Sequence, residues 1–182
     1  MSEVGIKTTE KEERKNPMLS IRIEKVIVHI CVGNNWERLQ KAVILLKNLT
    51  NRKPVIKKAK KTIKNFGISR GSPISCMVTL RKKEAEEFLK KALEAVNFRL
   101  KSSSFDRNGN FAFGIKEHLD IPGTKYDPKI GIFGMDVIVS LERPGYRVKR
   151  RKYRRSKVGK RALISREEAI EFMKEKFGVE IV

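Results

Sequence analysis

The chain has 182 residues, 40% of them hydrophobic, which is enough for one well-cored domain and excludes a disordered polyelectrolyte. Its formal net charge is +21, and two stretches, residues 38–83 and 143–166, contain no carboxylate at all. Solvated surfaces normally mix both signs of charge, so this concentration of cations is typical of a protein that binds a polyanion. We expect nucleic acid.

Few residues in the chain suit metal or redox chemistry. Cys31 and Cys76 are isolated, and His29 and His118 fit no metal-binding spacing, so we expect neither a metal nor another cofactor. No apolar run approaches the ~20 residues that cross a bilayer, so we expect no membrane partner.

Residues 1–16 are polar and charge-balanced and show no periodicity. We therefore expect a flexible N-terminal arm, followed by a single domain over residues 17–182. The domain begins with an alternating, β-branched segment at 21–32, which predicts a strand. One face of this strand is apolar, whereas the other is half polar and suits contact with something wet or charged. The half-polar face consists of Lys25, Ile27, His29 and Cys31.

The same periodicities predict the other elements. Helices are expected over residues 36–49, 82–96 and about 165–177. Further strands are expected over residues 55–58, 74–80, 111–116 and 135–141. The mixed order favours an α+β fold, with one antiparallel sheet, helices packed on one face and long basic loops.

Two basic segments interrupt this pattern. Residues 59–72 form a polar loop, punctuated by glycine and free of carboxylates. Residues 143–161 form a basic extension, with Tyr146 and Tyr153 among the cations, which suits base stacking as well as phosphate contact. Such density of charge favours an extension that is disordered until it meets RNA.

Two other functions fit local patterns less well. Glu117, His118 and Asp120 are the best acid–base cluster and would suit an RNA-processing enzyme, but a loop hydrogen-bond network explains them more simply. Residues 108–115 faintly resemble the RRM octapeptide, which keeps a general RNA-binding or chaperone protein of RRM-like type as the alternative. We prefer a core strand carrying Phe111 and Phe113, and we expect no enzyme.

Long ordered motifs carry a resemblance over residues 16–182. They are IRIEKVIVHICVG, LTNRKPVIKKAKKTIKNFGISRGSPI, FDRNGNFAFGIKEH, IPGTKYDP and GIFGMDV. They resemble the ribosomal protein L5 family, the universal 5S-rRNA-binding proteins of the large ribosomal subunit. The block RPGYRVKRRK and the closing helix resemble the archaeal and eukaryotic branch.

The resemblance implies a structural role in translation in the cytoplasmic ribosome, without catalysis. Such proteins seat 5S rRNA in the central protuberance, beside large-subunit rRNA and other central-protuberance proteins. They also contact P-site tRNA and bridge to a head protein of the small subunit.

The resemblance also implies site residues. Contacts to 5S rRNA fall on His29, Arg52, Lys53, Lys57, Ser75, Met77, Thr79 and Arg81. Many relatives carry Asn at the position of His29 and Gly-Gln at the positions of Asn51 and Arg52. The tRNA-facing loop offers Lys60, Lys61, Thr62, Lys64, Asn65, Phe66 and Arg70, while Ser69 replaces a frequent Arg. We expect additional rRNA contacts from Arg147, Lys149, Arg150, Arg151, Tyr153, Arg154 and Arg155.

Overall fold

A computed structural model describes residues 16–182 and has a five-stranded antiparallel sheet at its centre. The strand order is β2-β3-β1-β6-β5. The bounds are β1 (Arg22–Cys31), β2 (Val55–Lys58), β3 (Pro73–Leu80), β5 (Phe111–Ile115) and β6 (Met135–Glu142). Each of these strands was predicted from the sequence, and the predicted α+β class is confirmed.

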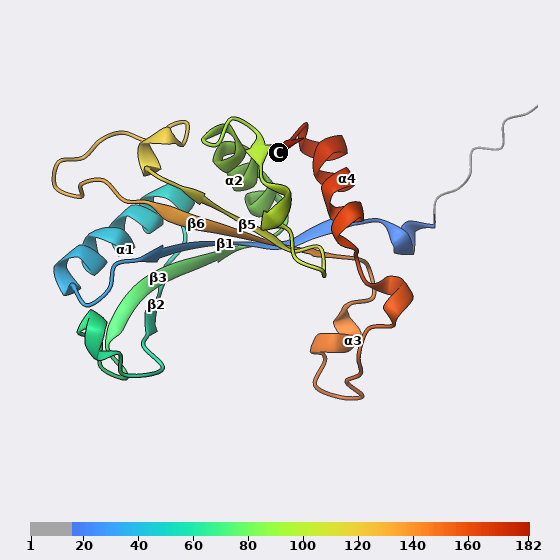
Figure 1. The fold of residues 1–182 in the computed structure, drawn as a ribbon, viewed down its shortest axis with the longest axis horizontal. Helices are drawn as coiled ribbons and strands as arrows, with labels where there is room; N and C mark the ends of the chain where they lie inside the picture. The colour runs from blue at the N-terminus through green and yellow to red at the C-terminus, as the bar shows by residue number, and fades with distance from the viewer. Residues whose placement is uncertain (1–15) are drawn as a thin grey trace, which may run out of the picture.

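Three long helices complete the core on one face of the sheet. They are α1 (Trp36–Thr50), α2 (Lys82–Glu94) and α4 (Arg166–Phe177). Their buried side chains join the inner faces of the strands in one apolar cluster, and Figure 1 shows α2 and α4 above the sheet. The N-terminus of α4 is fixed by a capping box between Ser165 and Glu168.

The opposite face of the sheet has no helix layer in the part of the chain that the structure describes (Figure 1). The central strand shows why. Val26, Val28 and Ile30 are at most 1% exposed, whereas the alternate residues Ile27 and His29 keep part of their surface. Alternation therefore buries one face and leaves the other, which we call the open face, available to a partner.

Several short elements escaped prediction. A second, parallel sheet joins β4 (Arg99–Leu100) to β7 (Glu180–Ile181) near the C-terminus. One turn of helix, α3 (Arg147–Arg150), lies in the basic extension. The 3-10 helices are η1 (Pro17–Leu19), η2 (Lys64–Phe66), η3 (Ser102–Ser104), η4 (His118–Asp120) and η5 (Lys160–Ala162).

The proposed N-terminal arm, residues 1–16, lies outside the described residues except for Asn16. The Asn16 side chain accepts a hydrogen bond from the backbone N–H of Met18 and so caps η1. Between residues 16 and 182, no helix is both long enough and apolar enough to span a membrane.

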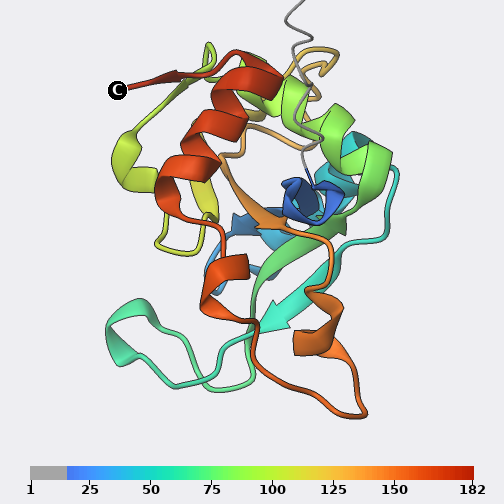
Figure 2. The ribbon, with the colours of Figure 1, turned by 90° about the vertical axis from the view of Figure 1, so that its right-hand side faces the viewer.

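The two basic segments project from the sheet on the side away from α2 and α4. Figure 1 shows the loop between β2 and β3 below one end of the sheet and the segment around α3 below the other end. Figure 2 shows the same two projections side by side at the bottom of the molecule. They therefore frame the open face from its two ends.

Candidate nucleic-acid interface

The open face presents rows of small, polar and basic side chains across the strands. Strand register places His29 between Met77 of β3 and Asp136 of β6. The imidazole Nδ1 lies 3.6 Å from a carboxylate oxygen of Asp136. In the next row, Thr79 lies opposite Ile27. Three predicted 5S-rRNA residues, His29, Met77 and Thr79, are thus neighbours on one surface.

A hollow at the β2 edge of the sheet brings together most of the predicted sheet site. Its lining includes Arg52, Lys53, Lys57, Met77 and Thr79, and its volume is about 390 Å³. No carboxylate lines it. The hollow therefore combines cations on the edge strand and its approach with small groups on β3, an arrangement that suits a phosphate backbone lying along the edge.

Two predicted sheet residues are less available to RNA, because one is buried and the other is paired within the chain. Ser75 lies on the open face between Lys57 and Cys31, but it is only 3% exposed. The guanidinium of Arg52 donates to Glu84 Oε1 at 2.6 Å and to Oε2 at 3.1 Å. This hydrogen-bonded pair raises the pKa of Arg52 and lowers the pKa of Glu84, so both groups stay charged. An RNA phosphate would have to compete with Glu84 for Arg52.

The loop between β2 and β3 is more ordered than its sequence suggests. Backbone hydrogen bonds close its base, from Ala59 N–H to Ser72 at 2.8 Å and from Gly71 N–H to Ala59 at 2.9 Å. Nearer the tip, Ile63 and Ile68 form an antiparallel bridge. The predicted polar loop is thus a hairpin-like projection whose base is closed by backbone hydrogen bonds.

The predicted tRNA-facing residues divide within this projection. Thr62 Oγ1 accepts the backbone N–H of Arg70 at 3.0 Å, so its hydroxyl has a structural role. Phe66 is 72% exposed at the tip. Within residues 16–182 the cations of the loop form no ion pair with a carboxylate. These cations are Lys60, Lys61, Lys64 and Arg70, and they lie exposed with Asn65.

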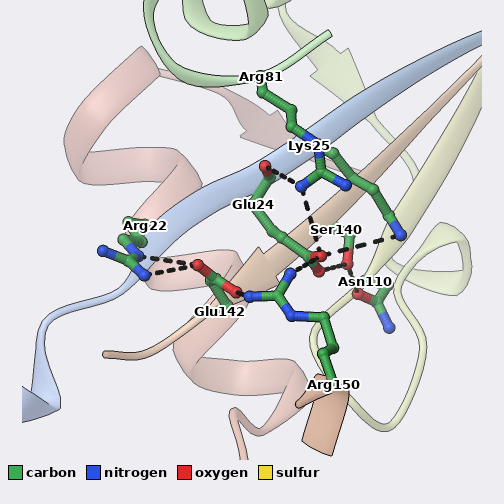
Figure 3. A network of polar contacts seen from close by, with 8 residues as sticks. All are labelled: Arg22, Glu24, Lys25, Arg81, Asn110, Ser140, Glu142 and Arg150. Carbon is green, nitrogen blue, oxygen red and sulfur yellow. Dashed lines mark hydrogen bonds and ion pairs between the residues drawn. The ribbon is translucent and has the colours of Figure 1, made fainter. Parts of the chain in front are cut away.

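At the other end of the open face, two nearly buried carboxylates form ion pairs with three arginines (Figure 3). The side chains of Glu24 and Glu142 are 13% and 7% exposed. Arg150 donates to both, at 2.7 Å to Glu142 Oε2. Arg22 binds the other oxygen of Glu142 at 2.7 Å, and Arg81 Nη1 lies 3.7 Å from Glu24 Oε1.

A β-bulge explains how Glu24 reaches this network. The register between β1 and β6 shifts between Ile23 and Lys25, which leaves Glu24 unpaired. A bulge of this kind re-aims a side chain. The carboxylate of Glu24 consequently accepts a hydrogen bond from Ser140 Oγ at 3.1 Å (Figure 3).

The network shows that stretches without a carboxylate of their own can still be paired with carboxylates from other parts of the chain. Arg81 and Arg150 were expected to contact RNA, but Glu24 and Glu142 engage both of them. Two of these pairs join residues far apart in the sequence, since Arg150 lies 126 positions from Glu24 and Arg22 lies 120 positions from Glu142. Arg150 is only eight positions from Glu142, and it reaches that carboxylate because the chain turns back after β6.

The basic extension is also folded against the domain rather than disordered. Arg150 fixes α3 to the sheet, and Tyr146 donates its hydroxyl proton to the Ala162 carbonyl at 2.8 Å. Tyr153 is 76% exposed, with the Arg154 guanidinium 5.4 Å from its ring centroid. The other predicted contacts of this segment are exposed, namely Arg147, Lys149, Arg151 and Arg155.

The residues that an acid–base enzyme or an RRM-like protein would need at the surface, His118 and Phe111, are buried. His118 is 2% exposed, and its Nδ1 accepts the backbone N–H of Phe133 at 3.4 Å. Phe111 is 2% exposed and stacks on Phe105 with ring centroids 4.9 Å apart. Phe113 packs against the same core. These positions support the core strand and the loop network, not base stacking or acid–base catalysis.

No group of three His, Cys, Asp or Glu that could hold a metal ion occurs among residues 16–182.

Comparison with known proteins shows the family of the chain. The ribosomal protein L5 family matches residues 16–69, and the model of that family's C-terminus matches residues 73–175. The large ribosomal subunit protein uL5 of Sulfurisphaera tokodaii is 57% identical over 168 residues, which cover 92% of this chain and 95% of that protein.

Two further relatives carry the same description. The uL5 protein of Sulfolobus acidocaldarius is 53% identical over 95% of this chain and 97% of its own length. That of Methanococcus vannielii is 48% identical over 92% of this chain and 94% of its own length. The chain therefore belongs to the ribosomal protein L5 family, whose members are structural proteins of the large subunit of the cytoplasmic ribosome and not enzymes.

Proposed function

We propose that this protein binds 5S rRNA through its open face and anchors it in the central protuberance of the large subunit, beside large-subunit rRNA and other proteins of that region. The observation that carries the proposal is the hollow at the β2 edge, where Lys53, Lys57 and Thr79 meet without a carboxylate. A pre-formed, cationic and shallow surface can dock against a fixed RNA backbone.

The loop at residues 59–72 is proposed to contact P-site tRNA and, with its surroundings, to bridge to a head protein of the small subunit. Its support is geometric and electrostatic. The loop projects beyond the sheet, its lysines are unpaired within residues 16–182, and its hydrophobic tip at Phe66 is exposed. Such a loop reads phosphate and shape rather than sequence, as is required of a surface that must accept every tRNA.

Titration of the purified protein with 5S rRNA, against an unrelated structured RNA of equal length, tests the first proposal. We expect a preference for 5S rRNA and a steep loss of affinity with salt, because each neutralised phosphate contributes about −0.7 to −0.9 to the slope of log K against log salt. Replacing Lys53 and Lys57 together by Ala should reduce the slope by about 1.4 to 1.8.

The matched control removes the same charge from the helical side. Lys90→Ala with Lys174→Ala changes two exposed lysines on α2 and α4, and it should leave the preference for 5S rRNA intact. Equal effects of the two double variants would show that the open face is not the binding surface. Absence of any preference for 5S rRNA would refute the assignment itself.

A further inference from the structure

The basic extension encloses a second hollow, separate from the open face. Figure 2 shows the chain leaving α3, turning, and returning through η5 toward α4. The hollow has a volume of about 590 Å³. Its apolar lining residues are Tyr146, Val158 and Leu163, and its cationic ones are Lys149, Arg155 and Lys157. No carboxylate lines it.

The walls of this hollow are held by contacts within the chain. The Tyr146 hydroxyl donates to the Ala162 carbonyl at 2.8 Å, and Arg143 Nη1 donates to the carbonyl of Leu163 at 3.4 Å. Across the turn, the backbone N–H of Ser156 donates to Val148 at 3.3 Å. The hollow therefore exists before a ligand arrives, which lowers the ordering cost of binding.

The residues that line the hollow favour a ligand with both a flat apolar part and a negative charge. Pockets for small organic groups have volumes of about 300–1,000 Å³ and combine an apolar interior with a few placed polar groups. An aromatic ring and two aliphatic side chains suit the flat face of a base, whereas three surrounding cations suit a phosphate. The exposed arginines of the same extension continue the positive charge away from the hollow, so the ligand is part of a longer polyanion.

We propose that this hollow receives one unpaired nucleotide of ribosomal RNA, with its base against Tyr146, Val158 and Leu163 and its phosphate on Lys149, Arg155 and Lys157. The inference rests on the proposed rRNA-binding function and deepens it. It assigns the basic extension a recognition site for an unstacked base, in addition to general attraction for phosphate.

Salt titrations of two variants of the full chain separate the two halves of the site. Val158→Ala with Leu163→Ala removes the apolar contacts, and we expect about fivefold to thirtyfold weaker rRNA binding with an unchanged salt slope, because no phosphate contact is lost. Lys149→Ala with Arg155→Ala should instead reduce the slope by about 1.4 to 1.8. Binding to 5S rRNA and to the larger rRNA is measured separately, which tells which RNA supplies the nucleotide.

The control removes two aliphatic side chains of similar exposure elsewhere. Ile44 and Ile132 are 49% and 47% exposed, against 41% for Leu163, and their replacement by Ala should leave rRNA affinity unchanged. Thermal unfolding checks that each variant folds. Chemical probing of base edges in the wild-type complex supplies a readout that needs no variant, and we expect the reactivity of a single unpaired nucleotide to change on binding.

Three outcomes would overturn the inference. Steep, salt-sensitive rRNA binding that is insensitive to Val158→Ala with Leu163→Ala would refute it and leave the proposed function standing. A defect that appears only in assembled subunits, with all base reactivities unchanged, would assign the hollow to a protein partner instead. Failure of the wild-type chain to prefer rRNA over an unrelated RNA would refute both proposals.

Discussion

His118 illustrates how burial decides the role of a single residue. The sequence places it beside Glu117 and Asp120, where it could serve an acid–base site, but its ring is 2% exposed and accepts a hydrogen bond from the Phe133 backbone. Burial lowers the pKa of His118 below its ordinary value, in spite of the nearby carboxylate of Glu117. The folded protein therefore holds the imidazole neutral.

The depressed pKa has a consequence for stability. As the pH falls below about 6.5, His118 becomes protonated in the unfolded chain before it does so in the folded chain. The free energy of unfolding should therefore decrease as the pH falls through this range. The slope from one such group is at most about 1.4 kcal/mol per pH unit. His118→Gln keeps an acceptor for Phe133 but does not titrate, and it should lose this component of the slope.

Urea unfolding at pH 5.5, 6.5 and 7.5 measures the effect. His118→Gln should also be less stable overall, by about 1–3 kcal/mol, because a packed ring is replaced. His29→Gln is the control, since that ring is 28% exposed on the open face. An unaltered pH dependence in His118→Gln would mean that another group is responsible.

Residue positions in the candidate site were predictable where alternation decides them. His29, Met77 and Thr79 point to the open face because each lies one step from a buried residue of the same strand. The burial of Ser75 and the pairing of Arg52 with Glu84 were not predictable, since both depend on neighbours across the sheet or 32 positions away.

At the scale of elements, local periodicity was sufficient for the five strands of the main sheet and the three long helices. It failed for β4 and β7, because two-residue strands have no period to detect. It failed also for α3, whose sequence is too cationic to fold alone and whose counter-charges stand on β1 and β6. Elements stabilised by distant contacts leave no local signal.

The attachment of α3 can be tested through Arg150. This side chain joins Glu24 and Glu142, whose carboxylates are too buried to be well solvated alone, so its loss should release the segment around α3 and cost about 1–3 kcal/mol. Hydrogen exchange of residues 147–158 should accelerate in Arg150→Ala. Arg147→Ala is the control, because it removes an equal charge from the same short helix without touching the two glutamates. Equal protection in both variants would show that the ion pairs do not hold the segment.

The whole molecule places its unpaired cations at separate locations. Lys53 and Lys57 belong to the edge of the sheet, whereas the lysines of the loop are carried away from it on a base tied through Ala59 and Ser72 (Figures 1 and 2). Between the sheet edge and α3, Glu24 and Glu142 neutralise part of the remaining positive charge. Net charge alone would predict one continuous RNA-binding surface, but its distribution over the fold separates the proposed contacts with 5S rRNA from those with tRNA.

This separation predicts that the two RNAs can be uncoupled. Reversing the charge of Lys60 and Lys61 to Glu changes exposed side chains outside the hollow at the sheet edge, so binding of the isolated protein to 5S rRNA should weaken by less than about threefold, through long-range repulsion alone. In ribosomes that carry the variant, P-site tRNA should dissociate faster, because carboxylates now face its phosphates. Lys53→Ala with Lys57→Ala should instead weaken the binding of the isolated protein to 5S rRNA, because both lysines line the hollow at the sheet edge. Parallel losses of both RNAs in both variants would mean that the loop and the sheet edge act as one site, and that the tied base of the loop does not separate them functionally.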